Sequence, residues 1–181
     1  MKTVAVLGST GEIGKKTLEC LRGLAKELRV HALCARSNYE LLVEQAVNFG
    51  AEKAAILERK FYSKLRTAAR KRMKVLAGIE GVSECCAGAD VVVFAMSGLT
   101  ALKPFYDSVV AGKTLAVANK EILVAAGELL AAQCANSGAR IIPIDSEHSG
   151  IFQIIEKFGT SHISRVTITA SGGPFLRTSK K

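Results

Sequence analysis

Thr3-Val4-Ala5-Val6-Leu7 followed by Gly8-Ser9-Thr10-Gly11-Glu12-Ile13-Gly14 is the stretch of sequence that decides the fold. The short apolar run predicts a buried strand and residues 13–28 predict an amphipathic helix, so the glycines fall in the turn between them. In this G-x-x-G-x-x-G spacing, Gly8 permits a tight turn, Gly11 lets the backbone approach a pyrophosphate and Gly14 lets helix and strand pack closely. The helix N-terminus adds unpaired N–H groups and a partial positive charge. The stretch therefore predicts a nucleotide-binding loop, with an ordinary glycine turn as the alternative.

Apolar runs of strand length alternate with longer helical patterns along the rest of the chain. The runs are continuously apolar, as expected for strands that are covered on both faces. This alternation indicates βαβ units, and we expect an α/β fold with a doubly wound, mostly parallel, Rossmann-like sheet. The expected strands are 3–7, 30–34, 54–57, 91–95, 114–117, 140–144 and 165–169, and the expected helices are 13–28, 39–49, 60–72, 100–110, 121–137 and 149–158.

The last part of the chain has a different character. After residue 144 come an acidic cluster, one more helix, one more strand and the turn Ser171-Gly172-Gly173, and the sequence stops at Lys181. We expect residues 1–144 to form the nucleotide-binding domain. Residues 145–181 are expected to be the incomplete beginning of a second domain.

The composition narrows the class of partner. Of the 181 residues 49% are hydrophobic, enough for a real core, and the formal net charge of +9 calls for an anionic partner. Nucleic acid is disfavoured because no base-stacking aromatics accompany the basic cluster, whose helical spacing predicts a solvated helix face. A phosphorylated cofactor and substrate suit the charge equally well. The cluster consists of Lys64, Arg66, Arg70, Lys71, Arg72 and Lys74.

The cysteines and the apolar runs indicate a compartment. Five cysteines without a C-x-x-C pair predict buried, reduced thiols rather than a disulfide framework or a zinc site. No run approaches the length of a membrane span, and the apolar start is too short for a signal peptide. We expect a soluble, cytoplasmic protein without a membrane partner. The cysteines are Cys20, Cys34, Cys85, Cys86 and Cys134.

The end of the second expected strand predicts which dinucleotide binds. NAD sites place an acid there for the ribose 2′-hydroxyl, whereas NADP sites place an arginine for the 2′-phosphate. Here Arg36-Ser37-Asn38 follows the strand, and the first acid is Glu40. Arginine offers bidentate bonds to phosphate, so NADP is favoured, although Asn38 also suits a helix cap.

Two polar clusters follow later strands. Asn119-Lys120-Glu121 lies beyond residue 117, where ligands of open α/β sheets bind, but a capping asparagine with an acid in the first turn explains it equally well. Asp145-Ser146-Glu147-His148 lies beyond residue 144. In an extended segment both carboxylates would project to one side and hold Mg²⁺ or Mn²⁺, whereas the alternative is again a helix N-terminus. We leave His148 out of the predicted site.

Taken together, these motifs resemble those of the 1-deoxy-D-xylulose 5-phosphate reductoisomerase family, an NADPH-dependent family of the non-mevalonate isoprenoid pathway. Matching segments occur in the family's order along the entire chain. They are Gly8-Ser9-Thr10-Gly11-x-Ile13-Gly14, Ala118-Asn119-Lys120-Glu121, Pro143-Ile144-Asp145-Ser146-Glu147-His148-Ser149-x-Ile151-Phe152-Gln153 and Ser171-Gly172-Gly173-Pro174-Phe175.

The resemblance implies a metal-assisted rearrangement of 1-deoxy-D-xylulose 5-phosphate, then hydride transfer from NADPH, giving 2-C-methyl-D-erythritol 4-phosphate. It implies Asp145 and Glu147 as ligands of Mg²⁺ or Mn²⁺, and a homodimer in the full-length enzyme. Lys120, Ser146, Glu147 and Ser171 would contact the substrate, with Lys120 and Glu147 as catalytic residues. The implied cofactor-binding residues are Gly8, Thr10, Gly11, Glu12, Ile13, Arg36, Ser37, Asn38, Asn119 and Glu121.

Three departures from the family pattern stand out. Glu12 replaces a usual serine and would repel the pyrophosphate unless it turns away, and Ile122 replaces a small polar residue. The family is about twice as long and supplies a third acidic metal ligand and a lid beyond this point, so we expect this chain to be inactive by itself. A stand-alone nucleotide-sensing module, or another NADP oxidoreductase acting on aspartate semialdehyde or homoserine, is the alternative. No candidate catalytic cysteine lies in a strand-helix turn, as the semialdehyde class requires.

Overall fold

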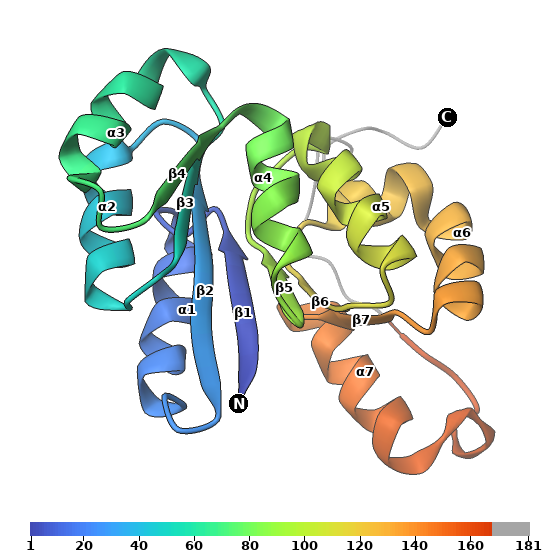
Figure 1. Cartoon of the computed structure of the whole chain (residues 1–181). Helices are drawn as coiled ribbons and strands as arrows, with labels where there is room; N and C mark the ends of the chain where they lie inside the picture. Colours follow the sequence, from blue (N-terminus) through green and yellow to red (C-terminus); the bar gives the residue numbers. More distant parts are fainter. Residues whose placement is uncertain (168–181) are drawn as a thin grey trace, which may run out of the picture. The chain divides into compact units, whose positions relative to one another are not determined.

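A computed structural model of the chain describes residues 1–167 (Figure 1). Its centre is a seven-stranded sheet in the order β4-β3-β2-β1-β5-β6-β7, and every neighbouring pair of strands is parallel. The chain first builds outward from β1 to β4 on one side, then crosses to the other side of β1 and continues through β5 to β7. The predicted doubly wound sheet is confirmed, and its winding reverses between β1 and β5.

The strands and helices alternate in sequence, as expected for repeated βαβ units. The strands are β1 (Lys2–Leu7), β2 (Leu28–Ala35), β3 (Lys53–Ile56), β4 (Lys74–Ala77), β5 (Val91–Phe94), β6 (Thr114–Val117) and β7 (Arg140–Pro143). The helices are α1 (Glu12–Gly23), α2 (Tyr39–Asn48), α3 (Tyr62–Ala69), α4 (Gly78–Ala87), α5 (Leu102–Val110), α6 (Lys120–Ser137) and α7 (Ser146–Phe158). Short 3₁₀ turns are η1 (Arg59–Phe61), η2 (Leu99–Ala101) and η3 (Thr160–His162).

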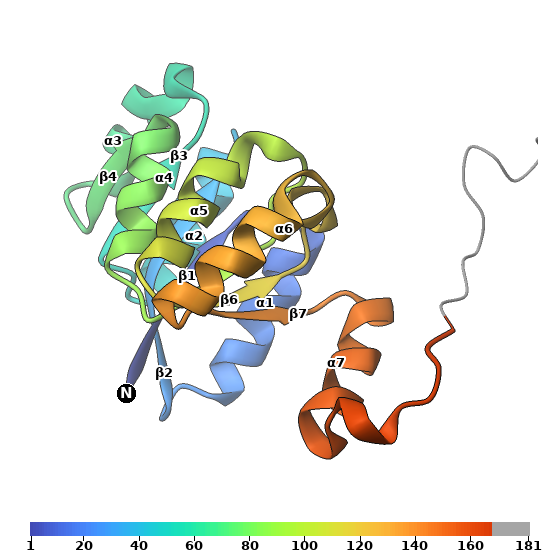
Figure 2. The same cartoon turned by 90° about the vertical axis from the view of Figure 1, so that its right-hand side faces the viewer.

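Both faces of the sheet are covered, which explains why the strands are apolar throughout. Successive side chains of a strand point to opposite faces, so Val4 and Val6 pack under α1, α2 and α3. Ala5 and Leu7 pack on the other face, under α4, α5 and α6, which lie side by side in Figure 2. Complete burial of a side chain such as Leu7 contributes about 1.5–3 kcal/mol, so these two layers fix the position of the loop after β1.

Neither β4 nor α4 was predicted from the sequence. The strand β4 is a short edge strand with partly exposed residues, and α4 contains Gly78 and Gly81, which weaken the helical signal. The expected helix 13–28 was too long, because α1 already ends at Gly23.

The predicted single helix face for the basic cluster was wrong. The helix α3 ends at Ala69, Arg70 and Lys71 adopt positive φ angles of 47° and 61°, and Lys74 begins β4. All six basic side chains of the cluster are nevertheless exposed to solvent.

The chain divides into two compact units, and the second begins at Asp145. The first, Met1–Ile144, holds the whole sheet. In the second, the described part contains α7 and η3, and residues 165–167 do not form the expected strand. Residues 168 and 169 of that strand and Ser171 lie outside the described residues. Within residues 1–167, no helix is long and apolar enough to cross a membrane.

Candidate nucleotide-binding site

The glycine loop leaves β1 and is held by the neighbouring strand. The amide groups of Gly8 and Ser9 both donate to the carbonyl oxygen of Cys34 in β2, over 2.8 and 2.9 Å. The amide of Gly11 donates to the carbonyl of Gly8 over 3.0 Å, which closes the turn. These three backbone hydrogen bonds stabilise the turn conformation of the loop.

At two positions of the loop, neighbouring backbone atoms leave no room for a side chain, so only glycine fits. Gly8 has a φ angle of +85°, and a Cβ there would lie 2.8 Å from the carbonyl oxygen of Ala95, just after β5. A Cβ at Gly14 would lie 2.2 Å from the carbonyl oxygen of Gly8. The loop, α1 and β5 thus approach one another more closely than any other residue type permits.

The helix α1 begins at Glu12, with Gly11 as its N-cap and no side chain capping it. Amide groups of the first turn therefore have no capping side chain, as an anion site at a helix N-terminus requires. The Glu12 carboxylate pairs with Lys16 one turn along α1, over 3.1 Å, and its side chain is 83% exposed. The Glu12 side chain therefore points along α1 and away from the loop, and Lys16 partly neutralises its negative charge.

A cleft of about 420 Å³ opens at the carboxyl ends of the strands on both sides of the switch between β1 and β5. This volume falls in the range of about 300–1,000 Å³ that is typical of small-molecule sites. Four strand ends contribute to the cleft. The lining residues are Gly8, Thr10 and Gly11 after β1, Arg36 after β2, Leu57 and Glu58 after β3, and Ala95, Met96, Ser97 and Thr100 after β5.

Arg36 reaches the cleft together with an acid that the sequence analysis missed. Its Nε donates to Oε1 of Glu58 over 3.0 Å, and Nζ of Lys60 lies 3.0 Å from Oε2 of the same carboxylate. The hydrogen bond from Lys60, with that from Arg36, lowers the pKa of Glu58. Because the Arg36–Glu58 bond uses Nε, the two terminal amino groups of the guanidinium retain their donors for a phosphate. The signal for Glu58 was its place directly after the third strand.

Ser37 and Asn38 lie between Arg36 and α2. The side chain of Asn38 accepts a hydrogen bond from the amide of Leu41 over 3.1 Å, so it caps α2. The carbonyl of Ser37 accepts a bond from the amide of Tyr39. The capping alternative for Asn38 is therefore confirmed, while its predicted cofactor contact stays a prediction.

Asn119 is 2% exposed and links the N-terminus of α6 to the segment that follows β5. Its Oδ1 accepts from the amide of Ile122 over 3.2 Å, which caps α6. Its Nδ2 donates to the carbonyl oxygens of Met96 and Gly98, over 2.6 and 2.8 Å. Both amide hydrogens are used, so Asn119 fixes the backbone that follows β5 and lines the cleft. Lys120 and Glu121 are exposed in the first turn of α6.

The acidic cluster of the second unit has a different local structure from the expected one. Asp145 is extended, but α7 begins at Ser146, so Glu147 lies in the first helical turn rather than in an extended segment. Nδ1 of His148 bonds the Asp145 carboxylate, and Ser146 Oγ lies 3.0 Å from Oε2 of Glu147. The expectation of an extended segment was wrong, because Ser, Glu and His in succession also suit a helix start.

The two carboxylates remain candidate ligands for a cation. Both are oxygen donors of the kind that Mg²⁺ and Mn²⁺ prefer. No group of three His, Cys, Asp or Glu residues suited to a metal occurs within residues 1–167. The assignment of Asp145 and Glu147 as metal ligands stays a prediction, and His148, which we had set aside, contacts the first of them.

The cysteines divide between the core and the surface. Cys34, Cys85 and Cys86 are buried as expected, and burial raises the pKa of Cys86 to about 12. Cys20 is exposed and Cys134 is half-buried, so the expectation of buried thiols held only for the first three.

A parallel sheet whose winding reverses beside a glycine loop, with a cleft across the reversal, defines a Rossmann-like fold, a class in which dinucleotides bind at such a reversal. Comparison with known proteins identifies a particular family within this fold class. The family model for 1-deoxy-D-xylulose 5-phosphate reductoisomerase matches residues 4–127, and the model for the C-terminal domain of the same enzyme matches residues 141–181. The chain belongs to the 1-deoxy-D-xylulose 5-phosphate reductoisomerase family.

Individual relatives agree with the family models. The reductoisomerase of Thermodesulfovibrio yellowstonii is 42% identical over 97% of this chain, and that of Desulfosudis oleivorans is 40% identical over all of it. The Zymomonas mobilis enzyme, solved in complex with NADPH, superposes with a TM-score of 0.90 at 38% identity over 98% of the chain. A reductoisomerase solved with magnesium superposes with a TM-score of 0.88 at 34% identity.

The match covers only part of each relative. The chain corresponds to 46% of the Thermodesulfovibrio protein and 48% of the Zymomonas chain. The chain therefore spans about half the length of the relatives it matches.

Proposed function

We propose that this chain is the NADPH-binding portion of a reductoisomerase that converts 1-deoxy-D-xylulose 5-phosphate into 2-C-methyl-D-erythritol 4-phosphate. The observation that carries the proposal is the meeting of the glycine loop and Arg36 in one cleft at the switch point of the sheet. The likeness to the Zymomonas enzyme, whose structure holds NADPH, supports the choice of cofactor.

The fit of NADPH to the cleft rests on two features of the first unit. The glycine loop has backbone packed so closely that a Cβ is excluded at Gly8 and Gly14, and the α1 N-terminus beside it lacks a capping side chain. Arg36 stands across the cleft with donors for a 2′-phosphate. In this proposal the cofactor-binding residues are Gly8, Thr10, Gly11, Glu12, Ile13, Arg36, Ser37, Asn38, Asn119 and Glu121.

Among these residues, the proposed contacts differ in kind. Glu12 points along α1, so its contact with the pyrophosphate would come from the backbone amide rather than the carboxylate. Both amide hydrogens of Asn119 are used by the chain itself, so Asn119 acts chiefly by holding Met96 and Gly98 beside the cofactor. The Glu121 carboxylate lies in the first turn of α6, where it interacts favourably with the positive end of the helix dipole.

We assign residues 1–144 to the NADPH-binding domain and residues 145–181 to the start of a metal- and substrate-binding domain. Asp145 and Glu147 would hold the divalent metal, and Lys120, Ser146, Glu147 and Ser171 would contact the phosphorylated sugar. When bound, the metal would polarise substrate oxygens as a Lewis acid and NADPH would supply hydride.

The chain's own residues would bind and orient the substrate. The Lys120 ammonium, exposed at the positive end of α6, suits a phosphate or a substrate oxygen that becomes negative during reaction. The Ser146 hydroxyl donates to Oε2 of Glu147, and its oxygen keeps lone pairs that would accept from a sugar hydroxyl. Lys120 and Glu147 are the proposed catalytic residues.

The remaining half of the relatives' length would complete the metal site and the assembly. We propose a cytoplasmic homodimeric enzyme that binds neither nucleic acid nor membrane. This chain would hold NADPH without completing the reaction.

A calorimetric titration of the 181-residue chain with NADPH and with NADH tests this proposal. We expect NADPH to bind more tightly, because only it carries the phosphate for Arg36. Equal affinities, or no binding of either nucleotide, would refute the cofactor assignment.

A further inference from the structure

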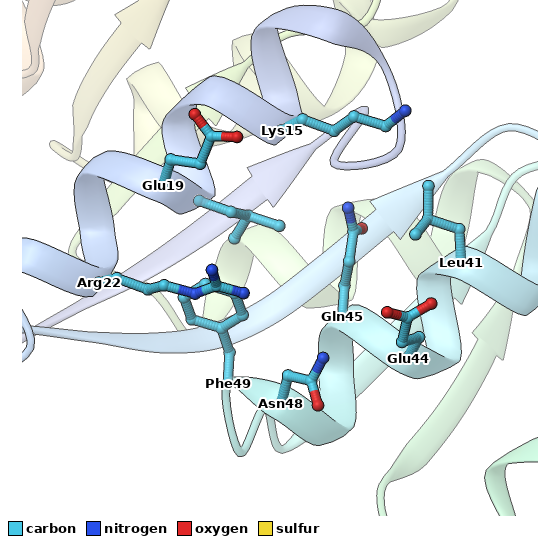
Figure 3. A pocket seen from close by; sticks show the side chains of 9 residues that line it. Lys15, Glu19, Arg22, Leu41, Glu44, Gln45, Asn48 and Phe49 are labelled. Carbon is cyan, nitrogen blue, oxygen red and sulfur yellow. The ribbon is translucent and has the colours of Figure 1, made fainter.

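Gln45 links α2 to the glycine loop. It is only 8% exposed, and its Nε2 donates a hydrogen bond to the carbonyl oxygen of Ser9 over 3.0 Å. Figure 3 shows the Gln45 side chain extending from α2 toward α1, inside a pocket between the two helices. This bond joins residues that are 36 positions apart in the sequence.

Burying the Gln45 amide lowers the stability of the fold unless its hydrogen bonds compensate for the lost contact with water. Within residues 1–167, Oε1 of Gln45 is buried without a hydrogen-bond partner, and so is Oγ of Ser9. A buried acceptor that lacks a partner destabilises the fold, whereas an apolar side chain of similar shape would avoid that cost. The favourable interaction of Gln45 is therefore its bond to the loop carbonyl.

The glycine loop forms hydrogen bonds with both β2 and α2. The amides of Gly8 and Ser9 donate to Cys34 in β2, while the carbonyl of Ser9 accepts from Gln45 in α2. The same helix α2 is capped by Asn38, two residues after Arg36. Gln45 thus ties the part of the cleft that would meet the pyrophosphate to the element that begins beside Arg36.

We infer that Gln45 is a positioning residue of the cofactor site. It holds the loop in its binding shape before the dinucleotide arrives, so that binding does not have to order the loop. This inference rests on the proposed NADPH function. It concerns the pyrophosphate side of the cleft, which NADPH and NADH share, and not the 2′-phosphate that distinguishes them.

Gln45→Met tests the role of the donor, because methionine has a similar length and no N–H. We expect the dissociation constants of NADPH and NADH to rise together by about 3- to 10-fold, the effect of one buried hydrogen bond. Their ratio should stay at the wild-type value, since Arg36 is untouched. Asn48→Met is the matched control, because Asn48 lies on α2 and lines the same pocket but is exposed. It should bind both nucleotides as the wild type does.

Gln45→Glu supplies a second reading if the methionine variant does not fold. A protonated carboxyl donates to the Ser9 carbonyl, whereas a carboxylate repels it, so the affinity loss relative to wild type should grow as pH rises. Burial favours the neutral acid, and the charged groups lining the pocket are Lys15, Glu19 and Arg22 from α1 and Glu44 from α2. Taking the ratio to wild type at each pH removes the titration of the nucleotide itself.

The outcomes separate the two proposals. A wild-type chain that binds neither nucleotide overturns the proposed function and this inference with it. Wild-type binding that is unchanged in Gln45→Met overturns the inference alone. A loss for NADPH without a loss for NADH, an equal loss in Asn48→Met, or a pH-independent Gln45→Glu ratio also contradicts the positioning role.

Discussion

Nε of Arg36 lies 3.0 Å from Oε1 of Glu58, so the cation at the proposed 2′-phosphate site is held by an acid from the neighbouring strand end. The two side chains follow β2 and β3, which are adjacent in the sheet. The bond restricts the orientation of a side chain that is otherwise 78% exposed. Arg36 is thereby aimed at the cleft, while the charge of Glu58 works against a bound phosphate.

Arg36→Ala should weaken NADPH binding selectively. The guanidinium can form charge-assisted hydrogen bonds with the 2′-phosphate, and their loss should raise the NADPH dissociation constant about tenfold or more. NADH lacks this phosphate, so its affinity should change little. Calorimetry with both nucleotides measures the difference, and an unchanged NADPH affinity would remove Arg36 from the site.

Glu58→Gln should strengthen NADPH binding. The glutamine Oε1 still accepts from Arg36 Nε, so the arginine keeps its orientation, but the negative charge beside the phosphate disappears. We expect the NADPH dissociation constant to fall by about two- to fivefold at low salt, with a smaller change at high salt.

The matched control for this charge effect is Glu80→Gln. Glu80 also pairs with an arginine, Arg59, over 2.6 Å, but it is not among the residues that line the cleft. Weaker NADPH binding by Glu58→Gln would mean that the carboxylate itself is needed, contrary to this interpretation.

Gly14→Ala should damage the loop. The added Cβ would lie 2.2 Å from the Gly8 carbonyl oxygen, so α1 or the loop must shift. We expect unfolding to become easier by about 1–3 kcal/mol, with weaker binding of both nucleotides. Gly23→Ala, in the same helix, adds a methyl group with no atom within 4 Å. Urea unfolding that gives the same stability for both variants would contradict the close packing.

Asp90 should make stability depend on pH. It accepts hydrogen bonds from the Thr3 amide and hydroxyl over 2.7 and 2.8 Å, and the backbone bond above all lowers its pKa. Its stabilising contribution is therefore complete above the unfolded-state pKa of about 3.9 and is lost as pH falls through the lowered folded-state pKa.

Urea unfolding of wild type and Asp90→Asn over this pH range measures the effect. The stability gap between the two proteins should be greatest near about pH 7 and shrink in acid. A gap that stays constant down to about pH 2 would show that the Asp90 charge does not stabilise the start of β5 against β1.

The sequence was informative where the signal is local. The apolar run before Gly8 and the spacing of the glycines predict β1, the loop and α1 because one short segment contains them all. Arg36 was found for the same reason, by its place after a strand. The family was recognised from such local motifs, and the family models confirm it.

The features of the site that were not predicted from the sequence depend on contacts between distant segments. Gln45 carries no signal of its own, because its role comes from a bond to Ser9, 36 positions away. The place of Glu58 after the third strand is a local signal, but its bond to Arg36, 22 positions away, is not visible in the sequence. The cluster after Ile144 is ambiguous for a different reason, since the same polar residues suit an extended segment and a helix start. Here the helix was formed, with Asp145 as its N-cap.

The most direct test of the account is an amide ¹H–¹⁵N spectrum of the chain with and without saturating NADPH. If NADPH binds in the cleft at the sheet reversal, the largest shifts should fall on the cleft-lining residues Gly8, Thr10, Gly11 and Arg36. Glu19 and Asn48, in the pocket between α1 and α2, should show small shifts. A spectrum that does not change, or one whose shifts gather between α1 and α2 and spare the glycine loop, would contradict it.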